Sequence, residues 1–149
     1  MEIRHILAPT DFSEYSQTAV AYAFELAKVF GAKLSLLHVI EMPPYPVEGY
    51  VPPSTAAAYV EDLERQANEE ISRLLSDAHA TNVEVARLVV MGTPSRKIID
   101  AAEAEQVDLI VMATAGRTGL SRLVVGSVAE RVVRTASCPV LTMRPTGEP

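Results

Sequence analysis

The sequence is poor in residues that could cross-link a fold covalently or through a metal. It has 149 residues, one cysteine and no tryptophan. A single cysteine cannot form an internal disulfide, and no metal-ligand spacing surrounds Cys138, so a disulfide scaffold and a cysteine-based zinc site are excluded. Cys138 lies between Ser137 and Pro139 just before an apolar run, and we expect it to be a small packing residue. One unpaired thiol agrees with a reducing compartment.

Long hydrophobic runs and an excess of basic charge are also absent. No stretch approaches the roughly 20 apolar residues of a membrane span, and the first residues enter a strand pattern without the apolar core of a signal peptide. The 13 Lys and Arg against 19 Asp and Glu give a formal net charge of −6, which disfavours a nucleic-acid or anionic-membrane surface. We therefore expect a cytoplasmic protein with no DNA, RNA or membrane partner.

Short apolar runs and amphipathic stretches alternate along the chain. Asp11 or Ser13 is expected to cap the first helix, which ends near residue 30 with Gly31 as its left-handed terminator. The spacing predicts further helices at about 56–78, 94–105 and 127–135, and strands at 3–8, 34–40, 83–90, 107–113 and 140–143.

The one long irregular connection is expected at residues 41–55. It contains five prolines, which exclude a regular helix or a central strand. It is either a lid over a site or a surface crossing. No repeat interrupts the alternation, and we expect one domain over residues 1–149 with a tail at 145–149.

This alternation predicts an α/β fold. Right-handed crossovers build a parallel five-stranded sheet with helices on both faces, which is a doubly wound architecture. If strands two and three lie on one side of strand one and strands four and five on the other, the order is 3-2-1-4-5. The chain then reverses direction between strands one and four, and ligands bind at such a switch point, outside the carboxyl ends of the strands. The flanking loops are residues 9–13 and 113–127.

A segment rich in glycine and hydroxyl residues follows the fourth predicted strand. It consists of Ala113-Thr114-Ala115-Gly116, then nine residues, then Gly126-Ser127-Val128 at the start of the last helix. Backbone N–H groups at a helix start can face an anion, glycines allow close approach, and Arg117 and Arg122 make the loop cationic. These features favour a phosphate-bearing ligand. The alternative is that Gly116 only turns the chain while Ser127 and Glu130 form a capping box.

The sequence lacks the motifs that known enzymes use to hydrolyse a nucleotide. The P-loop motif G-x-x-x-x-G-K-[ST] does not occur, which favours holding a nucleotide over hydrolysing it quickly. His5, His38 and His79 are scattered, so their spacing supports neither a metal site nor a Ser–His–Asp arrangement.

Asp11 is the candidate polar contact in the other flanking loop. It could contact a ribose hydroxyl, a base edge or a phosphate-bound magnesium ion. The alternative is that Asp11 caps the first helix with Glu14 three residues later. Val39, at the carboxyl end of the second strand, could pack against a base, although an apolar residue there is usually part of the core.

Several short motifs occur in the order and spacing of one family. They are Pro9-Thr10-Asp11-Phe12-Ser13, Leu37-His38-Val39-Ile40, Gly116-x₉-Gly126-Ser127, Ser127-Val128-Ala129-Glu130-Arg131-Val132 and Cys138-Pro139-Val140-Leu141. On these motifs nearly the whole chain resembles the universal stress protein family. The resemblance implies a five-stranded Rossmann-like fold of the adenine nucleotide alpha hydrolase type, a stress-response or signalling role and frequent homodimers. In one branch it also implies ATP binding through G-x-x-G-x₉-G-[ST].

The resemblance also implies which residues bind the nucleotide. Those carried over to the adenosine are Pro9, Thr10, Asp11, Val39, Met112 and Ala113. Gly116, Gly126, Ser127 and Val128 would line the phosphates. From their charge alone, we add Arg117 to the phosphate contacts and Asp11 as a candidate ligand of a nucleotide-bound magnesium ion. The first glycine of the pattern is Ala113 here. If that position needs positive φ, alanine costs about 1 kcal/mol or more; if only close approach is needed, one methyl is tolerated. ATP is the expected ligand, with AMP or ADP as shorter alternatives.

The fifth predicted strand is the candidate dimer interface. Val140-Leu141-Thr142-Met143 would be an apolar edge strand able to pair with a second copy, as the resemblance also implies, unless Arg144 and Pro145 guard the edge of a monomer.

Three functions stay open. They are a nucleotide-binding stress or signalling module, a slow ATP hydrolase using Asp11 and Arg117 or Arg122, and a ligand-free interaction protein. The first is preferred, and an enzyme is less expected.

Overall fold

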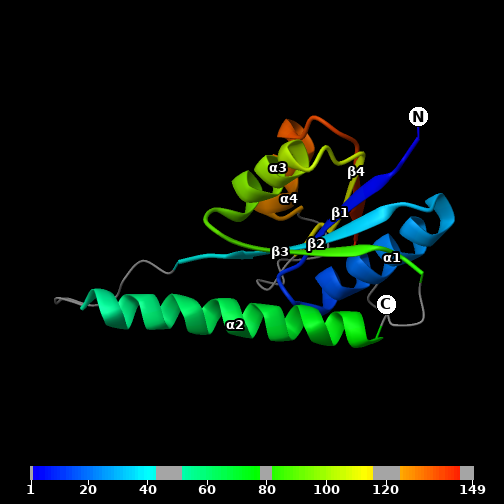
Figure 1. Ribbon diagram of the computed structural model, residues 1–149. Coiled ribbons are helices and arrows are strands. Elements are labelled where there is room, and N and C mark those ends of the chain that lie inside the picture. Colours follow the sequence, from blue (N-terminus) through cyan, green and yellow to red (C-terminus); the bar gives the residue numbers. More distant parts are fainter. Residues whose placement is uncertain (1, 43–51, 78–81, 116–124, 145–149) are drawn as a thin grey trace, which may run out of the picture.

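A computed structural model describes residues 2–42, 52–77, 82–115 and 125–144 (Figure 1). Strands and helices alternate through these residues. In chain order they are β1 (His5–Pro9), α1 (Glu14–Phe30), β2 (Lys33–Ile40), α2 (Pro53–Asp77), β3 (Val85–Met91), α3 (Pro94–Ala104), β4 (Leu109–Ala113), α4 (Ser127–Thr135) and β5 (Val140–Met143).

The strands form one parallel sheet in the order β3-β2-β1-β4-β5, which confirms the predicted order. Ala8 of β1 is in register with Leu36 of β2, and Ile6 with Leu109 of β4. Helices α1 and α2 cover one face of the sheet, and α3 and α4 cover the other (Figure 1). The architecture is therefore the expected doubly wound one.

Alternating side chains of the central strands build a core on each face. Ile6 and Ala8 of β1 face α1, whereas Leu7 between them faces α3 and α4. Because both faces are covered, the central strands are apolar at nearly every position.

Cys138 is half-buried against the α3–α4 core, which confirms its expected packing role, and burial raises the pKa of its thiol.

Local signals set most helix ends. Gly31 has φ of 64°, and its N–H donates to the carbonyl oxygens of Ala27 and Lys28, so it ends α1 as predicted. Pro94 starts α3 at the expected position. The expectation that residues 41–55 hold no regular helix is wrong at its end, because α2 begins at Pro53. Proline fits the first helical position, where its missing N–H has no intrahelical partner to lose. Residues 43–51 lie outside the described residues, so the choice between lid and surface crossing stays a prediction.

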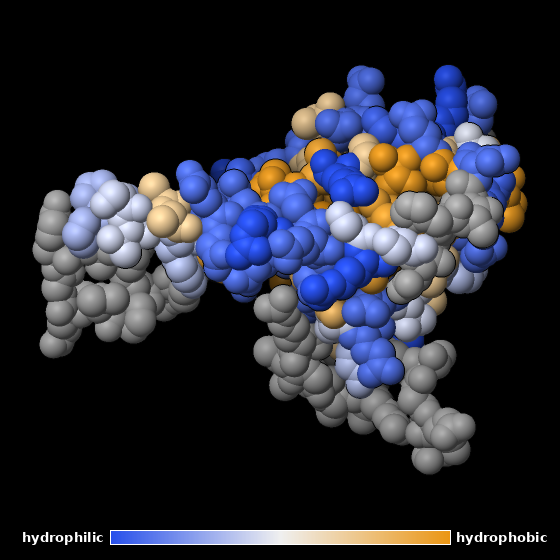
Figure 2. All heavy atoms as spheres, turned by 60° about the horizontal axis from the view of Figure 1, so that its bottom comes forward, coloured by the Kyte–Doolittle hydropathy of each residue, from blue (hydrophilic) through white to orange (hydrophobic). Residues whose placement is uncertain are grey.

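Helix α2 is longer than the sheet that it covers. Its 25 residues span about 37 Å at 1.5 Å per residue, and its amino-terminal part extends past the sheet (Figure 1). Only the second half is anchored by buried residues: Ala67, Ile71 and Leu75. The projecting end carries little strongly hydrophobic surface (Figure 2). Among the described residues, no helix is long and apolar enough to span a membrane.

Candidate functional site

The switch point lies where β1 and β4 are neighbours. Their residues Leu7 and Ile110 are in register, and the two strands end at Pro9 and Ala113. From there the chain leads to α1 on one face and to α4 on the other (Figure 1). The two connections therefore diverge around the carboxyl end of the central strands, where sheets of this kind bind ligands.

Thr10 fixes the loop between β1 and α1. Its N–H donates to the Leu37 carbonyl at 2.8 Å, and its carbonyl lies 2.8 Å from Nδ1 of His38. Its Oγ1 accepts the Phe12 N–H at 3.0 Å and lies 3.0 Å from Oγ of Ser16. A buried threonine with its backbone and side chain bonded in this way holds the loop in one conformation.

Phe12 carries backbone strain in this loop. Its φ is 65°, a left-handed value that costs a bulky residue roughly 1–2 kcal/mol. Several contacts offset this cost. The Phe12 carbonyl accepts from the side-chain amide of Gln17, and the Phe12 ring stacks on His38 with centroids 4.3 Å apart. Strain that the surroundings hold in place is characteristic of functional sites.

Asp11 lies between these two residues. Its Oδ1 accepts hydrogen bonds from the N–H of Ser13 at 3.0 Å and from the Ser13 hydroxyl at 2.5 Å. Ser13 is the N-cap of α1, because its Oγ accepts the Ser16 N–H at 3.3 Å. Of the two predicted caps, Ser13 is therefore correct, and Asp11 supports the cap through an Asx turn. The predicted capping of α1 by Asp11 itself is wrong.

In the second connection, directly after β4, Thr114 joins three elements. Its N–H donates to the carbonyl of Met143 at 2.8 Å, and its Oγ1 donates to the same oxygen at 3.2 Å. The Thr114 carbonyl accepts the Gly126 N–H at 2.7 Å. Thr114 thus connects the end of β4 with the end of β5 and the start of α4.

This contact explains the glycine at position 126. Gly126 has φ of −60° and ψ of 150°, which any residue can adopt, but a Cβ there would lie 3.0 Å from the Thr114 carbonyl oxygen. The glycine therefore allows the close approach of the Thr114 carbonyl, and the predicted approach of a phosphate stays a prediction.

The start of α4 differs from the predicted capping box. Gly126 is the N-cap, with no side-chain hydrogen bond, and Ser127 is the first helical residue. Glu130 pairs with Arg134 at 2.6 Å instead. The alternative in which Ser127 caps the helix with Glu130 is therefore wrong. The first intrahelical bond runs from Glu130 N–H to the Gly126 carbonyl, so the N–H groups of residues 127–129 precede it and form the positive end of the helix.

Ala113 adopts ordinary strand backbone. It is the last residue of β4 and is in register with Met143. Among the described non-glycine residues, only Phe12 and Gln106 have positive φ. The alternative in which alanine is strained at position 113 is therefore wrong, and only the presence of one methyl distinguishes Ala113 from the glycine of the pattern.

The remaining predicted residues have different surroundings. Val39 is half-buried and packs with Met112 in the core beneath α3 and α4, and Met112 is only 5% exposed. Pro9 is buried, Ser127 is exposed and Val128 is half-buried. Gly116, Arg117 and Arg122 lie outside the described residues. The structure therefore brings the loop around Asp11 and the start of α4 to one edge of the sheet, and leaves the basic side chains undescribed.

Sequence reasoning missed the roles of Phe12, His38 and Thr114. The only roles considered for His38 were those of a metal ligand and of a member of a Ser–His–Asp arrangement, and its spacing supported neither. Leu34, Leu36 and His38 alternate on one face of β2, and all three are buried. A buried polar side chain needs a hydrogen-bond partner. The position of His38 in this apolar alternation could therefore have predicted a hydrogen bond to a neighbouring loop.

Fold and site together define a class of protein, a doubly wound α/β protein whose chain reverses direction between β1 and β4. The chain belongs to the universal stress protein family, which it matches over residues 2–144. It is 35% identical to universal stress protein MJ0531 of Methanocaldococcus jannaschii, over 95% of this chain and 82% of that protein.

Solved structures agree with this assignment. Hypothetical protein MJ0577 of the same organism is similar with a TM-score of 0.80 at 26% identity, over 99% of this chain and 100% of that one. Universal stress protein UspA from Lactobacillus plantarum gives a TM-score of 0.80 at 26% identity, over 97% and 99% of the two chains. The family and fold predicted from the sequence are both confirmed.

Proposed function

We propose that this chain is a cytoplasmic, homodimeric stress-response module that binds an adenine nucleotide, with ATP the preferred ligand, at the carboxyl edge of β1 and β4. The observation that carries the proposal is the amino end of α4. Its cap, Gly126, offers no side-chain acceptor, and its first N–H groups precede the helical hydrogen bonds. Such an end attracts an anion, and it lies at the switch point.

The nucleotide would lie between the two connections. Pro9, Thr10, Asp11, Val39, Met112 and Ala113 would surround the adenosine, with Thr10 acting mainly through the loop that it shapes. The phosphates would be held by Gly116, Arg117, Gly126, Ser127 and Val128. Two more distant universal stress proteins of this fold have been solved with adenine nucleotides, one with cAMP at 22% identity and one with dAMP at 19%.

Asp11 suits a magnesium ion that accompanies the phosphates. A carboxylate oxygen is a hard ligand of the type that this ion takes, and Oδ1 accepts two hydrogen bonds from Ser13, as an ionised carboxylate does. Bound magnesium would offset phosphate charge. The role of Asp11 is to orient one acceptor toward that position.

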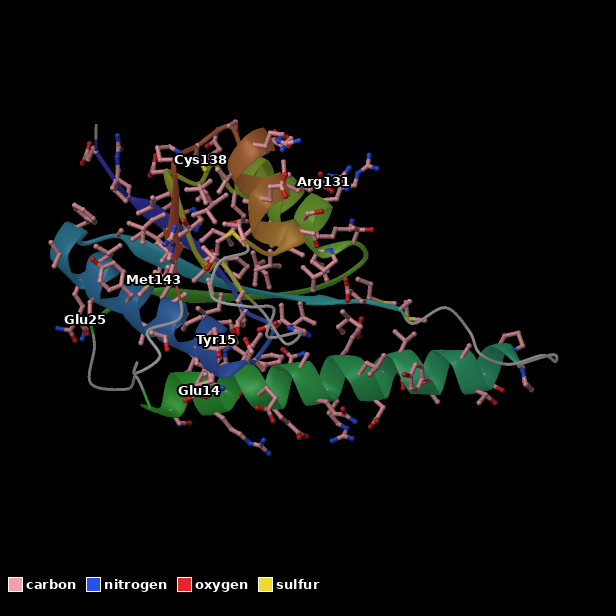
Figure 3. All side chains as sticks on the ribbon, turned by 180° about the vertical axis from the view of Figure 1, so that it is seen from behind. Glu14, Tyr15, Glu25, Arg131, Cys138 and Met143 are labelled. Carbon is pink, nitrogen blue, oxygen red and sulfur yellow. The ribbon has the colours of Figure 1, made fainter. Side chains whose placement is uncertain are left out.

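The dimer would form through β5, which lies at the edge of the sheet. It ends at Met143, which Figure 3 labels together with Cys138 just before the strand, and among the described strands it pairs only with β4. Its outer side could therefore add a strand from a second copy. A proline at Leu141 would disrupt this edge. We expect Leu141→Pro to be monomeric by light scattering, and a dimeric Leu141→Pro would exclude this interface.

The nucleotide site is tested by placing a negative charge at the start of α4. Ser127→Asp should weaken ATP binding about tenfold or more through repulsion of the phosphates, while raising stability by about 0.3–1 kcal/mol because an acid at a helix start is favourable. Ser127→Ala is the matched neutral control. Binding is measured by calorimetry with magnesium and ATP, and stability by urea unfolding.

Mass spectrometry of small molecules released from the purified protein identifies the natural occupant. ATP, ADP or AMP near one per chain, with weaker binding by Ser127→Asp, supports the proposal. Equal affinities of the two position-127 variants contradict the α4 site. A wild-type protein with no released nucleotide and no binding contradicts the nucleotide function as a whole.

The contact between Gly126 and Thr114 favours a second candidate, a ligand-free interaction protein of the same fold. In that case Gly126 serves only the close approach of the two chain segments. The wild-type binding measurement separates the two functions, because the second candidate predicts no adenine nucleotide at any stage.

A further inference from the structure

His38 is a polar residue in a core position of β2. It is 9% exposed and continues the alternation of Leu34 and Leu36, which pack beneath α1 and α2. Its Nδ1 lies 2.8 Å from the carbonyl oxygen of Thr10. Because a carbonyl can only accept, Nδ1 carries the proton and donates it. The ring therefore holds the residue that precedes Asp11.

The same ring also contacts the residue that follows Asp11. Phe12 and His38 are stacked, with ring centroids 4.3 Å apart and planes at 30°. Phe12 is the residue with φ of 65°, a backbone conformation that its own side chain disfavours. One side chain from β2 thus fixes both neighbours of Asp11, while the Leu37 carbonyl beside it accepts the Thr10 N–H.

We propose that His38 is a positioning residue for the ligand site: it holds Thr10 and Phe12 so that Asp11 is presented at the switch point. This inference rests on the proposed nucleotide function and concerns the same site. His38 acts through the loop and not by contact with the nucleotide. Its imidazole combines a donor at the δ position with a flat ring, and the loop uses both.

Two substitutions separate these features. His38→Leu keeps an apolar side chain of similar reach but removes the donor, and His38→Asn keeps a δ-amide donor close to the position of Nδ1 but removes the ring. We expect His38→Leu to weaken binding of magnesium and ATP about tenfold, as for the loss of one buried hydrogen bond. His38→Asn should recover about half of that loss on a logarithmic scale. Equal affinities of wild type and His38→Leu would overturn the proposal.

A double-mutant cycle with Asp11 distinguishes positioning from general damage. If His38 acts through Asp11, His38→Leu weakens binding about tenfold in the wild type but less than about twofold in an Asp11→Asn background. If both backgrounds lose affinity by the same factor, His38 does not act through Asp11 and the proposal is wrong. Urea unfolding of each variant verifies that the protein is folded under the binding conditions.

A measurement on the ligand-free protein keeps the inference separate from the proposed function. The N–H groups of Phe12 and Ser13 donate to Thr10 Oγ1 and Asp11 Oδ1, so their hydrogen exchange reports the loop directly. We expect His38→Leu to raise these two exchange rates about tenfold, while Glu130 N–H, bonded within α4, is unchanged. Unchanged rates at Phe12 and Ser13 would overturn the positioning role.

The outcomes can be told apart. If the wild type binds no nucleotide but the loop exchange responds to His38→Leu, the proposed function fails and His38 still holds the loop. If the wild type binds ATP and neither readout responds, the function stands and the His38 inference fails. If His38→Leu does not fold, Phe12→Leu removes the stack instead and is expected to accelerate the same two amides.

Discussion

The two connections at the switch point differ in how their polar groups are hydrogen-bonded. In the loop after β1, Thr10 and Asp11 are hydrogen-bonded to neighbouring residues, and the left-handed Phe12 is held by its N–H bond to Thr10 and by its stack on His38. At the start of α4 the cap is a glycine without a side-chain bond. The first connection is preorganised by the protein itself, whereas the second presents N–H groups outward. We call the loop at residues 10–13 the rigid wall of the site and the start of α4, residues 126–129, its attractive wall. Such a site can orient a ligand on the rigid wall and bind its negative charge at the attractive wall.

The largest expected effect comes from weakening the rigid wall. Thr10→Val keeps the shape of the side chain but removes the hydroxyl that accepts the Phe12 N–H and contacts Ser16. Two buried polar groups then lose a partner, and Phe12 loses one of the contacts that offset its strain. We expect a decrease of about 2–3 kcal/mol in the free energy of unfolding, measured in urea. Thr18→Val on the exposed side of α1 is the matched control, and an equal loss in both variants would contradict this account of Thr10.

A smaller loss is expected from crowding the attractive wall. The Cβ of Gly126→Ala would lie 3.0 Å from the Thr114 carbonyl oxygen, so the two segments must separate by a few tenths of an ångström. We expect a decrease of about 1–2 kcal/mol in the free energy of unfolding, even without any ligand. Calorimetric or urea unfolding of the nucleotide-free protein measures it. If stability is unchanged and only nucleotide affinity falls, Gly126 serves the ligand and not the Thr114 contact.

The smallest expected effect concerns the amino ends of the central strands, where the carboxylate of Asp108 accepts backbone N–H groups. Asp108 accepts the N–H groups of Arg4 and His5 at 2.8 and 2.9 Å, and the hydrogen bond from Arg4 is the main cause that lowers the pKa of Asp108. A carboxylate with a lower pKa in the folded state stabilises the fold above its unfolded pKa, and this contribution is lost as pH falls through the folded pKa.

Asp108→Asn removes that contribution. We expect the variant to be less stable than the wild type at pH 7 and the difference to shrink as pH falls below about 4, the ordinary range of an aspartate. Urea midpoints measured across the acid range give the difference. A constant gap between the two proteins at all pH values would show that Asp108 does not act through its charge.

Much of the fold follows from local pattern, because the alternation of elements predicts the layers and the handedness of crossovers limits the possible strand orders. The order 3-2-1-4-5 also needed the assumption that strands two and three lie on the opposite side of strand one from strands four and five. Gly31, Pro94 and the bounds of α4 and β5 were predicted from the residues beside them. Two features of the site were not. The cap of α4 is Gly126 because Thr114, twelve positions earlier, accepts its N–H. Phe12 gives no sign of a left-handed backbone, since its conformation is imposed by Thr10 and His38. Those contacts join separate elements, and no local pattern contains them.

Thr114 also has a consequence for how the molecule transmits change. The carbonyl of Met143, the last residue of the outermost strand, accepts both the N–H and the hydroxyl of Thr114, and the carbonyl of Thr114 accepts the N–H that opens α4. The outer strand and the amino end of α4 are therefore joined through the hydrogen bonds of Thr114. Because three hydrogen bonds connect Met143, Thr114 and Gly126, we expect a displacement of β5 to be felt at the start of α4.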